Sequence, residues 1–280
     1  MRVLLTGATS QIGVALRALL QGQGHEVVAL SRNAVVDDAS VRWQQADLGD
    51  GWPGVGRFDA VISFGPMQAL ADALAALPEA PCRRLVATSS MSAVSKRESA
   101  VPEDRALSAA LREAESALAA QCERLGIGWT VLRPTMIYGL GVDENISPIA
   151  RRAMRTRVFP YPPGRGMRQP VHAEDVALAA WRAVHHEDAA GETIEIGGGE
   201  RLRLDAMFRR VRDSLPAWTL PLPVPRGVLG MATWLRPGLR GFVSRIDQDL
   251  LADNTRLEKI LGVKPRGFSP GPAQWREAAK

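Results

Sequence analysis

Short runs of apolar residues, each bounded by turn-forming residues, recur through the first half of the chain. The runs with the length and composition of buried strands are Arg2–Thr6, Glu26–Leu30, Val41–Gln45, Ala60–Phe64, Arg84–Ser89 and Gly128–Arg133. Apolar residues at helical spacing fill several intervals, notably Ile12–Leu20, Gln68–Leu77 and Leu107–Leu125. Because strands that alternate with helices form parallel sheets covered on both faces, we expect an α/β fold with a Rossmann-type, doubly wound parallel sheet.

The pattern changes after about Gly139, where Pro and Gly become frequent and loops separate the helical segments. This change predicts a Rossmann domain over residues 1–165 and a smaller C-terminal substrate lobe over residues 166–280. Two later segments are still expected to return to the sheet, Asp175–Val184 as a capped amphipathic helix and Thr193–Ile196 as a strand.

One apolar segment of the second lobe, Val224–Phe242, needs a separate interpretation. It is interrupted by Pro225, Arg226, Arg236, Pro237 and Arg240. The stretches between these residues are too short to span a bilayer. We favour a hydrophobic lid or a homodimer face for this segment over a helix that lies on a membrane surface.

The amino-acid composition narrows the expected binding partners of the protein more than it narrows its expected fold. The apolar share of 46% and the charged share of 23% are ordinary for a globular protein, and arginine carries most of the net charge of +5. Acidic residues are interleaved with the arginines, so we expect a phosphate-bearing small molecule as partner, and no nucleic acid. Cys82 and Cys122 have neither CxxC spacing nor a nearby His cluster, so no metal site is expected. The chain opens directly into a strand pattern, which favours a cytoplasmic protein.

A glycine-containing segment follows the first strand, Thr6-Gly-Ala-Thr-Ser-Gln-Ile-Gly13, and leads into a helix. Gly7 permits a tight turn, and Gly13 lets the helix pack closely on the strand. The backbone N–H groups between them, at the helix N-terminus, suit a pyrophosphate. The residues predicted to hold it are Gly7, Thr9, Ser10, Gln11, Ile12 and Gly13.

This segment resembles the Thr-Gly-x-x-Gly-x-x-Gly cofactor motif of the extended short-chain dehydrogenases/reductases, the NAD-dependent epimerase/dehydratase family. Ser10 replaces the middle glycine, which implies an adjustment of the loop. The resemblance further implies that Asp47 and Leu48 bracket the adenine and that Phe64 and Gly65 line the other side of the cofactor.

The second strand ends in Ala29-Leu-Ser-Arg32, where an acidic residue would accept hydrogen bonds from the ribose of NAD. An arginine suits a 2′-phosphate instead, because its planar donors match the phosphate oxygens. We therefore expect NADP(H) in preference to NAD(H). The alternative is a solvated arginine at a strand end.

The resemblance implies a Ser or Thr after the fifth strand, and a Tyr and a Lys spaced four residues apart on the next helix. Ser90 occupies the first of these positions. Counted back from Ala114-Glu115, which resembles an Ala-Glu pair of the family, Leu107 stands in place of the tyrosine and Leu111 in place of the lysine. We therefore expect no tyrosine-dependent hydride transfer, and only Ser90 to orient a reacting carbonyl or hydroxyl.

The loop that follows Ser90 carries further charges. We interpret Lys96, Glu98 and Asp104 as exposed loop charges, with a role in proton transfer as the alternative.

Three later segments resemble the substrate side of the family. They are Leu132-Arg-Pro-Thr-Met-Ile-Tyr-Gly139, Asn145-Ile-Ser-Pro148 and Arg168-Gln-Pro-Val-His-Ala-Glu-Asp175. The resemblance implies that Asn145 and Arg168 approach the diphosphate of a nucleotide sugar. The structural alternatives are that Asn145 ends a turn, that His172 satisfies backbone groups and that Asp175 caps a helix.

Two functions stay open. The first is an atypical NADP(H)-dependent oxidoreductase or epimerase that acts on a small, nucleotide-sugar-like substrate. The second is a catalytically inactive, dinucleotide-binding redox sensor or assembly factor. Asn145 and Arg168 favour a substrate, whereas Leu107 and Leu111 argue against ordinary turnover.

Overall fold

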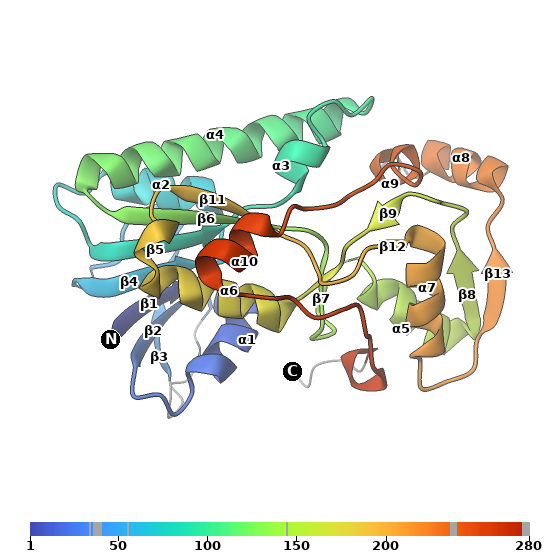
Figure 1. The fold of residues 1–280 in the computed structure, drawn as a ribbon, viewed down its shortest axis with the longest axis horizontal. Helices are drawn as coiled ribbons and strands as arrows, with labels where there is room; N and C mark the ends of the chain where they lie inside the picture. The colour runs from blue at the N-terminus through green and yellow to red at the C-terminus, as the bar shows by residue number, and fades with distance from the viewer. Residues whose placement is uncertain (34, 36–40, 55, 144, 236–239, 276–280) are drawn as a thin grey trace.

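A seven-stranded parallel sheet forms the centre of the N-terminal lobe (Figure 1). The computed structural model of the protein describes residues 1–275 except 34, 36–40, 55, 144 and 236–239. In sheet order the strands are β3 (Val41–Gln45), β2 (Glu26–Ser31), β1 (Arg2–Thr6), β4 (Phe58–Ser63), β5 (Cys82–Thr88), β6 (Gly128–Pro134) and β11 (Glu192–Ile196). The order reverses between β1 and β4, which is the topological switch point of a doubly wound fold. The predicted fold class is confirmed.

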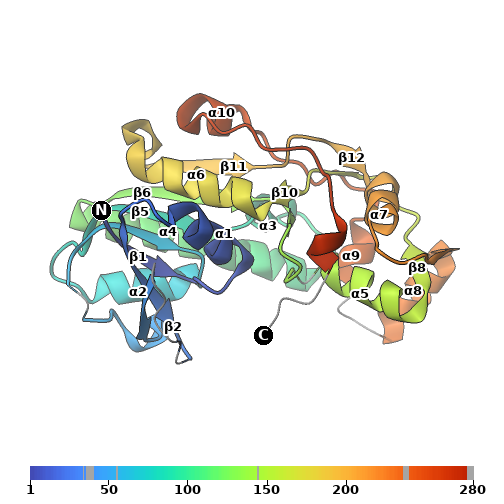
Figure 2. The same ribbon diagram turned by 90° about the horizontal axis from the view of Figure 1, so that it is seen from below.

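Helices cover both faces of this sheet (Figures 1 and 2). One face carries α1 (Gln11–Leu20), α6 (Ala173–His185) and α10 (Thr255–Leu261), and the other carries α2 (Met67–Ala75), α4 (Pro102–Leu125) and the short helix η1 (Leu48–Asp50). Because side chains alternate along a strand, Val3 and Leu5 join the first core and Leu4 joins the second. Strands buried on both faces are nearly continuous apolar runs, which is why the sequence reveals them.

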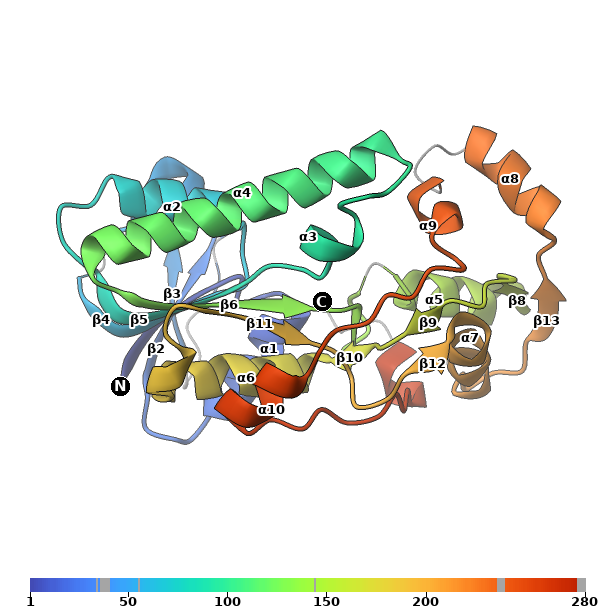
Figure 3. The ribbon, with the colours of Figure 1, turned by 45° about the horizontal axis from the view of Figure 1, so that its top comes forward.

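The second lobe lies beyond the carboxyl ends of β6 and β11 (Figure 3). Its elements are α5 (Ser147–Thr156), β8 (Val158–Tyr161), α7 (Leu204–Asp213), β13 (Leu220–Pro223), α8 (Arg226–Leu235) and α9 (Arg240–Ser244). Three two-stranded pairs complete it, β8 with β13, β7 (Ile137–Tyr138) with β10 (Val171–His172), and β9 (Met167–Arg168) with β12 (Leu202–Arg203). The described residues also form the short helices α3 (Ser92–Ser95), η2 (Glu187–Ala189) and η4 (Pro272–Trp275).

The core of the second lobe joins segments from both sides of residue 165. Ala150 and Phe159 pack in one cluster with Leu204 and Phe208. Meanwhile α6 and β11 lie with the sheet, since β11 pairs with β6 from Glu192 to Ile196. The second lobe is therefore assembled from two separate stretches of chain. Across the described residues, no helix is long and apolar enough to cross a membrane.

Candidate functional site

The turn after β1 requires glycine at two positions. Gly7 has a φ of +65°, and a Cβ there would lie 2.6 Å from the carbonyl carbon of Phe64. A Cβ on Gly13 would lie 2.3 Å from the carbonyl oxygen of Gly7. The loop between β4 and α2, which includes Gly65, therefore presses against the turn, and α1 packs on it without a side chain between them.

The side chain of Ser10 is accommodated by capping α1. Its Oγ accepts a hydrogen bond of 3.1 Å from the N–H of Gly13, and its own N–H donates to the carbonyl of Gly7 at 2.9 Å. This is the loop adjustment that replacement of the middle glycine implied. The N–H groups of Gln11 and Ile12 donate to no acceptor among the described residues, so both remain available to an anion at this end of α1.

The side chain of Gln11 connects the glycine turn to the other half of the site. Its Nε2 donates to the carbonyl of Ile137 at 3.4 Å. Its Oε1 is buried and has no hydrogen-bond partner in the described part of the chain. A buried, unpartnered amide oxygen is costly in a protein interior, which makes this atom a candidate acceptor for a ligand.

The predicted adenine end lies at β2 and η1. Arg32 directly follows β2 and is exposed, and its guanidinium has no hydrogen bond or ion pair among the described residues. The Oδ1 of Asp47 accepts from the N–H of Gly49 at 2.9 Å, which caps η1. Leu48 is buried in the core beneath α2. No group of the described residues thus occupies the guanidinium of Arg32, while Asp47 and Leu48 already have structural roles.

Two serine hydroxyls lie where β5 ends. The Oγ of Ser90 accepts from the N–H of Ser92 at 3.1 Å. The Oγ of Ser89 is buried without a partner in the described chain. Sequence reasoning singled out Ser90, whereas Ser89 has the hydroxyl that is free to bind another group.

The helix α4 carries leucines at the two positions singled out in the sequence. Leu107 is 43% exposed and Leu111 is half-buried. Further along α4, Glu115 forms an ion pair with Arg133 of β6, which fixes the helix on the sheet. The hydrogen bonds that Arg133 donates to Glu115 raise the pKa of Arg133 above its ordinary value, so Arg133 stays charged.

The interpretation of Lys96 and Asp104 as exposed loop charges is wrong, although Glu98 is exposed. Asp104 is buried and accepts from Lys96 Nζ at 2.8 Å, and Arg245 Nε lies 3.6 Å from its other oxygen. Burial alone would raise the pKa of Asp104, but the hydrogen bond from Lys96 and the charge of Arg245 hold it below its ordinary value. Because Arg245 follows α9, this cluster joins the two lobes.

Arg168 is 7% exposed, and its guanidinium binds the backbone of the segment that follows α9. Its Nη1 donates to the carbonyls of Met167 at 2.9 Å and Gln248 at 2.7 Å, and its Nη2 donates to that of Arg245 at 2.8 Å. Burial and the charge of Arg245 lower the pKa of Arg168 to about 10. These bonds hold the second lobe together, and the diphosphate contact implied by the resemblance stays a prediction.

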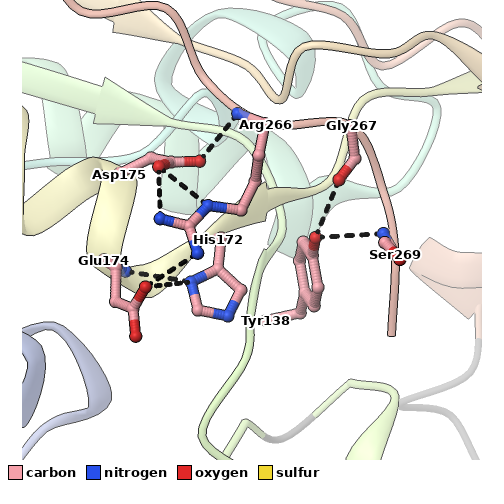
Figure 4. A network of polar contacts seen from close by, with 7 residues as sticks. All are labelled: Tyr138, His172, Glu174, Asp175, Arg266, Gly267 and Ser269. Atoms are coloured by element: carbon pink, nitrogen blue, oxygen red, sulfur yellow. Dashed lines mark hydrogen bonds and ion pairs between the residues drawn. The ribbon is translucent and has the colours of Figure 1, made fainter. Parts of the chain in front are cut away.

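His172 caps α6 (Figure 4). Its Nδ1 accepts from the N–H of Glu174 at 3.3 Å, which confirms that it satisfies a backbone group. The sequence interpretation had Asp175 as the cap of this helix. The structure places Asp175 within the first turn of α6 instead, so it is not the cap. Its two oxygens accept from the backbone N–H and the Nε of Arg266, at 3.0 Å each.

Tyr138 belongs to the same network (Figure 4). Its hydroxyl donates to the carbonyl of Gly267 at 3.2 Å and accepts from the N–H of Ser269 at 3.4 Å. Burial raises its pKa above the ordinary value. Tyr138 therefore fastens the C-terminal segment to β7.

Asn145 lies in the turn before α5, and its side chain is exposed. Its backbone N–H donates to Asp143 Oδ1 at 3.1 Å. The same oxygen accepts from the N–H groups of Ile146 at 2.6 Å and Ser147 at 3.1 Å. Sequence reasoning missed Asp143, although an acidic residue just before a helix that starts Ser-Pro is a recognisable cap.

The strand order of the sheet and the glycine turn at its first strand define a Rossmann-type fold. The family model described as NAD dependent epimerase/dehydratase family matches residues 66–197. The matched residues make up just under half of the chain, and the match supports the resemblance to this family.

One curated relative is UDP-glucose 4-epimerase of Vibrio cholerae. It is 26% identical over 158 residues, which are 55% of this chain and 47% of the relative. The matched part therefore spans about half of the length of that relative.

Solved structures share the fold over nearly the whole chain. UDP-glucuronic acid 4-epimerase from Bacillus cereus in complex with NAD has a TM-score of 0.73 at 15% identity, covering 98% of this chain and 94% of that one. MoeE5 in complex with UDP-glucose and NAD has a TM-score of 0.74 at 20% identity, covering 98% of this chain and 97% of that one. At these identities the likeness is one of fold.

Proposed function

We propose that this protein binds a nicotinamide dinucleotide, NADP(H) in preference to NAD(H), and acts on a small substrate of the nucleotide-sugar class. The observation that carries the proposal is the pair of unpartnered N–H groups of Gln11 and Ile12, above a turn in which neither Gly7 nor Gly13 leaves room for a side chain. Such a helix N-terminus binds a pyrophosphate through its amides and its dipole. The bound cofactor would supply a hydride acceptor or donor.

Arg32 is the basis for the preference between the two cofactors. Its exposed guanidinium follows β2, where the 2′ position of an adenosine ribose is bound in Rossmann folds, and no described residue competes for it. Charge-assisted hydrogen bonds contribute about 1.5–3 kcal/mol, or roughly 10- to 150-fold in affinity. The structures named above contain NAD, so the preference rests on Arg32 alone.

Calorimetric titration with NADPH and NADH tests this proposal. For Arg32→Ser we expect NADPH affinity to fall roughly 10- to 150-fold while NADH affinity stays the same. Arg42→Ser is the matched control, because Arg42 is exposed on the neighbouring strand β3. Equal affinity of the unaltered protein for both cofactors would refute the preference for NADP(H), and binding of neither would refute the dinucleotide site.

The chain's own groups at the reacting end are few. Ser89 would donate a hydrogen bond to a substrate oxygen, because its buried hydroxyl has no other partner in the described chain. The hydroxyl of Ser90 already accepts from Ser92 but still has a proton to donate. Leu107 and Leu111 of α4 have no acidic or basic group. Proton transfer would therefore involve water or a polar group of the substrate.

A second candidate is a dinucleotide-binding sensor without turnover. It is favoured by the leucines of α4 and by the backbone hydrogen bonds that occupy Arg168. Titration with UDP-glucose and UDP-glucuronic acid, together with the absorbance of the reduced nicotinamide, separates the two candidates. The enzyme proposal expects sugar binding that weakens in Asn145→Ala without loss of stability, since Asn145 is exposed. NADPH binding without sugar binding or turnover would identify the sensor.

A further inference from the structure

The helix α8 presents its apolar side chains to solvent. Val228, Met231 and Trp234 are 48%, 67% and 80% exposed, while Leu229 packs against the core of the second lobe. At about 3.6 residues per turn, the three exposed side chains fall within an arc of about 120° opposite Leu229. This is the reverse of an ordinary surface helix, whose outward face is polar.

The edge strand β13 adds to this surface. Trp218, just before β13, is 74% exposed, and Leu220 and Leu222 are half exposed. The ladder partners of the two leucines are Val158 and Pro160 of β8, which line a groove of about 450 Å³. We call Trp218, Leu220, Leu222, Val228, Met231 and Trp234 the apolar end patch. Figures 1 and 3 show α8 and β13 at the end of the molecule away from the seven-stranded sheet.

Arginines outnumber acidic residues in the segments that carry the apolar end patch. Residues 145–173 and 214–246 contain ten arginines and neither Asp nor Glu, although the net charge of the whole chain is only +5. Arg152, Arg155 and Arg157 are exposed at the end of α5, and the carbonyl of Arg157 accepts the N–H of Leu220 at the start of β13. Arg226 and Arg240 are exposed at the starts of α8 and α9, and Arg226 forms an ion pair of 2.8 Å with Asp247. Arginines therefore adjoin the patch on several sides.

Exposed apolar side chains next to exposed arginines indicate the chemistry of the partner that would cover the apolar end patch. Clustered exposed aromatic and aliphatic side chains favour an apolar phase, and tryptophan is the residue enriched at the boundary between lipid headgroups and acyl chains. Arg152, Arg155 and Arg157 form no ion pair with the described acidic residues, so they favour anions. A second copy of this chain would bring the same unbalanced arginines face to face in a symmetric contact, which is repulsive.

We propose that the apolar end patch is a membrane-surface docking site. Trp218, Met231 and Trp234 would enter the headgroup region of a bilayer, and the neighbouring arginines would bind anionic lipid headgroups. This reverses the preference for a lid or a dimer face drawn from the sequence of Val224–Phe242, because the sequence alone does not reveal which side of α8 is exposed. The proposal is independent of turnover and of cofactor binding.

Sedimentation of the full chain with vesicles tests the docking site. We expect binding to vesicles of phosphatidylcholine mixed with phosphatidylglycerol, weaker binding to phosphatidylcholine alone, and a blue shift of tryptophan emission on binding. High salt should weaken the association. Inorganic phosphate should neither shift the emission nor compete at low millimolar concentration, which separates a bilayer from a free phosphate as the ligand.

Paired variants locate the contact. Trp218→Ser with Trp234→Ser should lower vesicle affinity at least about tenfold, and Arg152→Gln with Arg155→Gln should lower it roughly fivefold for each charge removed. The controls replace exposed side chains of the same chemical class on the N-terminal lobe. They are Val14→Ser with Val94→Ser for exposed apolar residues and Arg42→Gln with Arg83→Gln for exposed arginines.

Because the altered side chains are exposed, unchanged thermal unfolding should show that the variants fold. Absence of binding to either kind of vesicle would overturn the proposal, as would equal losses in the patch variants and their controls. A dimer in light scattering that the tryptophan variants dissociate, without vesicle binding, would instead identify a second copy as the occupant.

Discussion

Replacement of Asp104 by alanine is expected to loosen the attachment of the C-terminal lobe. The buried carboxylate of Asp104 binds Lys96 at 2.8 Å and Ser99 Oγ at 3.2 Å, and lies 3.6 Å from Arg245 Nε. Asp104→Ala leaves both cations without this partner in a region that is mostly closed to water. The segment that follows α9 would then lose its charged contact with α4.

The magnitude follows from the exposure of the partners. Removal of one member of a buried ion pair costs about 3–5 kcal/mol. The side chains of Lys96 and Arg245 retain 16% and 14% exposure, so solvent screens part of the loss. We therefore expect Asp104→Ala to lower the free energy of unfolding by about 2–3 kcal/mol, somewhat less than removal of a fully buried partner would. In a chain of this size the corresponding fall in Tm is about 5–10 °C.

Thermal unfolding followed by circular dichroism measures this change, and amide hydrogen exchange over residues 240–248 tests whether the loss is local. Glu103→Ala is the matched control, because Glu103 precedes Asp104 in the first turn of α4 and is exposed. Lys96→Met in the Asp104→Ala background should recover part of the loss, since it removes an unpaired charge. If Asp104→Ala and Glu103→Ala gave the same Tm and the same exchange rates, the bridge between the lobes would have no energetic role.

Three further outcomes are expected. Gly13→Ala should weaken NADPH binding and lower the free energy of unfolding by about 1–3 kcal/mol, because its Cβ would lie 2.3 Å from the carbonyl oxygen of Gly7. Calorimetry measures the NADPH affinity and thermal unfolding measures the stability. Unchanged affinity and stability would contradict the close approach of α1 to the turn. Ser10→Ala should cost about 1 kcal/mol through loss of the cap, whereas Ser10→Gly should cost only a few tenths in the same unfolding assay. Burial and the charge of Arg266 lower the pKa of His172 from 6.5. As the pH falls, His172 therefore becomes protonated in the unfolded chain before it does in the folded chain. The stability that neutral His172 contributes is retained above about pH 6.5 and is lost as the pH falls below that value. His172→Asn keeps a capping acceptor and should flatten that fall in Tm, and an unaltered pH profile would exclude His172 as a contributor.

The sequence predicted the sheet and its helices well because these elements are locally encoded. Each strand of the sheet lies within two residues of its expected range, since a strand buried on both faces must be apolar along its length. The glycine turn was also predictable, because the positive φ of Gly7 and the contact of Gly13 with Gly7 and Ala8 arise within one short segment. The place of Ser10 as a cap follows from the same short segment.

The errors concern contacts between distant parts of the chain. Asp104 was expected to be an exposed loop charge, but its burial depends on Arg245, which lies far from it in sequence. Asp175 was expected to cap α6 but binds Arg266 instead, again a distant residue. Neither periodicity nor motif spacing reports such pairings, so a buried ion pair and an exposed loop charge look alike in the sequence. The role of Arg32 stays a prediction for another reason, since its expected partner is a ligand.

The return of late segments to the sheet has a consequence for biosynthesis. Leu257 and Leu261 of α10 pack in the same core as Val3 and Leu5 of β1. During translation, the sheet face that contains Val3 and Leu5 is therefore not fully covered until most of the polypeptide has been synthesised. Such non-local packing slows folding and leaves apolar surface open on the ribosome-bound chain. Nascent protein is expected to depend on chaperones until α10 has emerged from the exit tunnel.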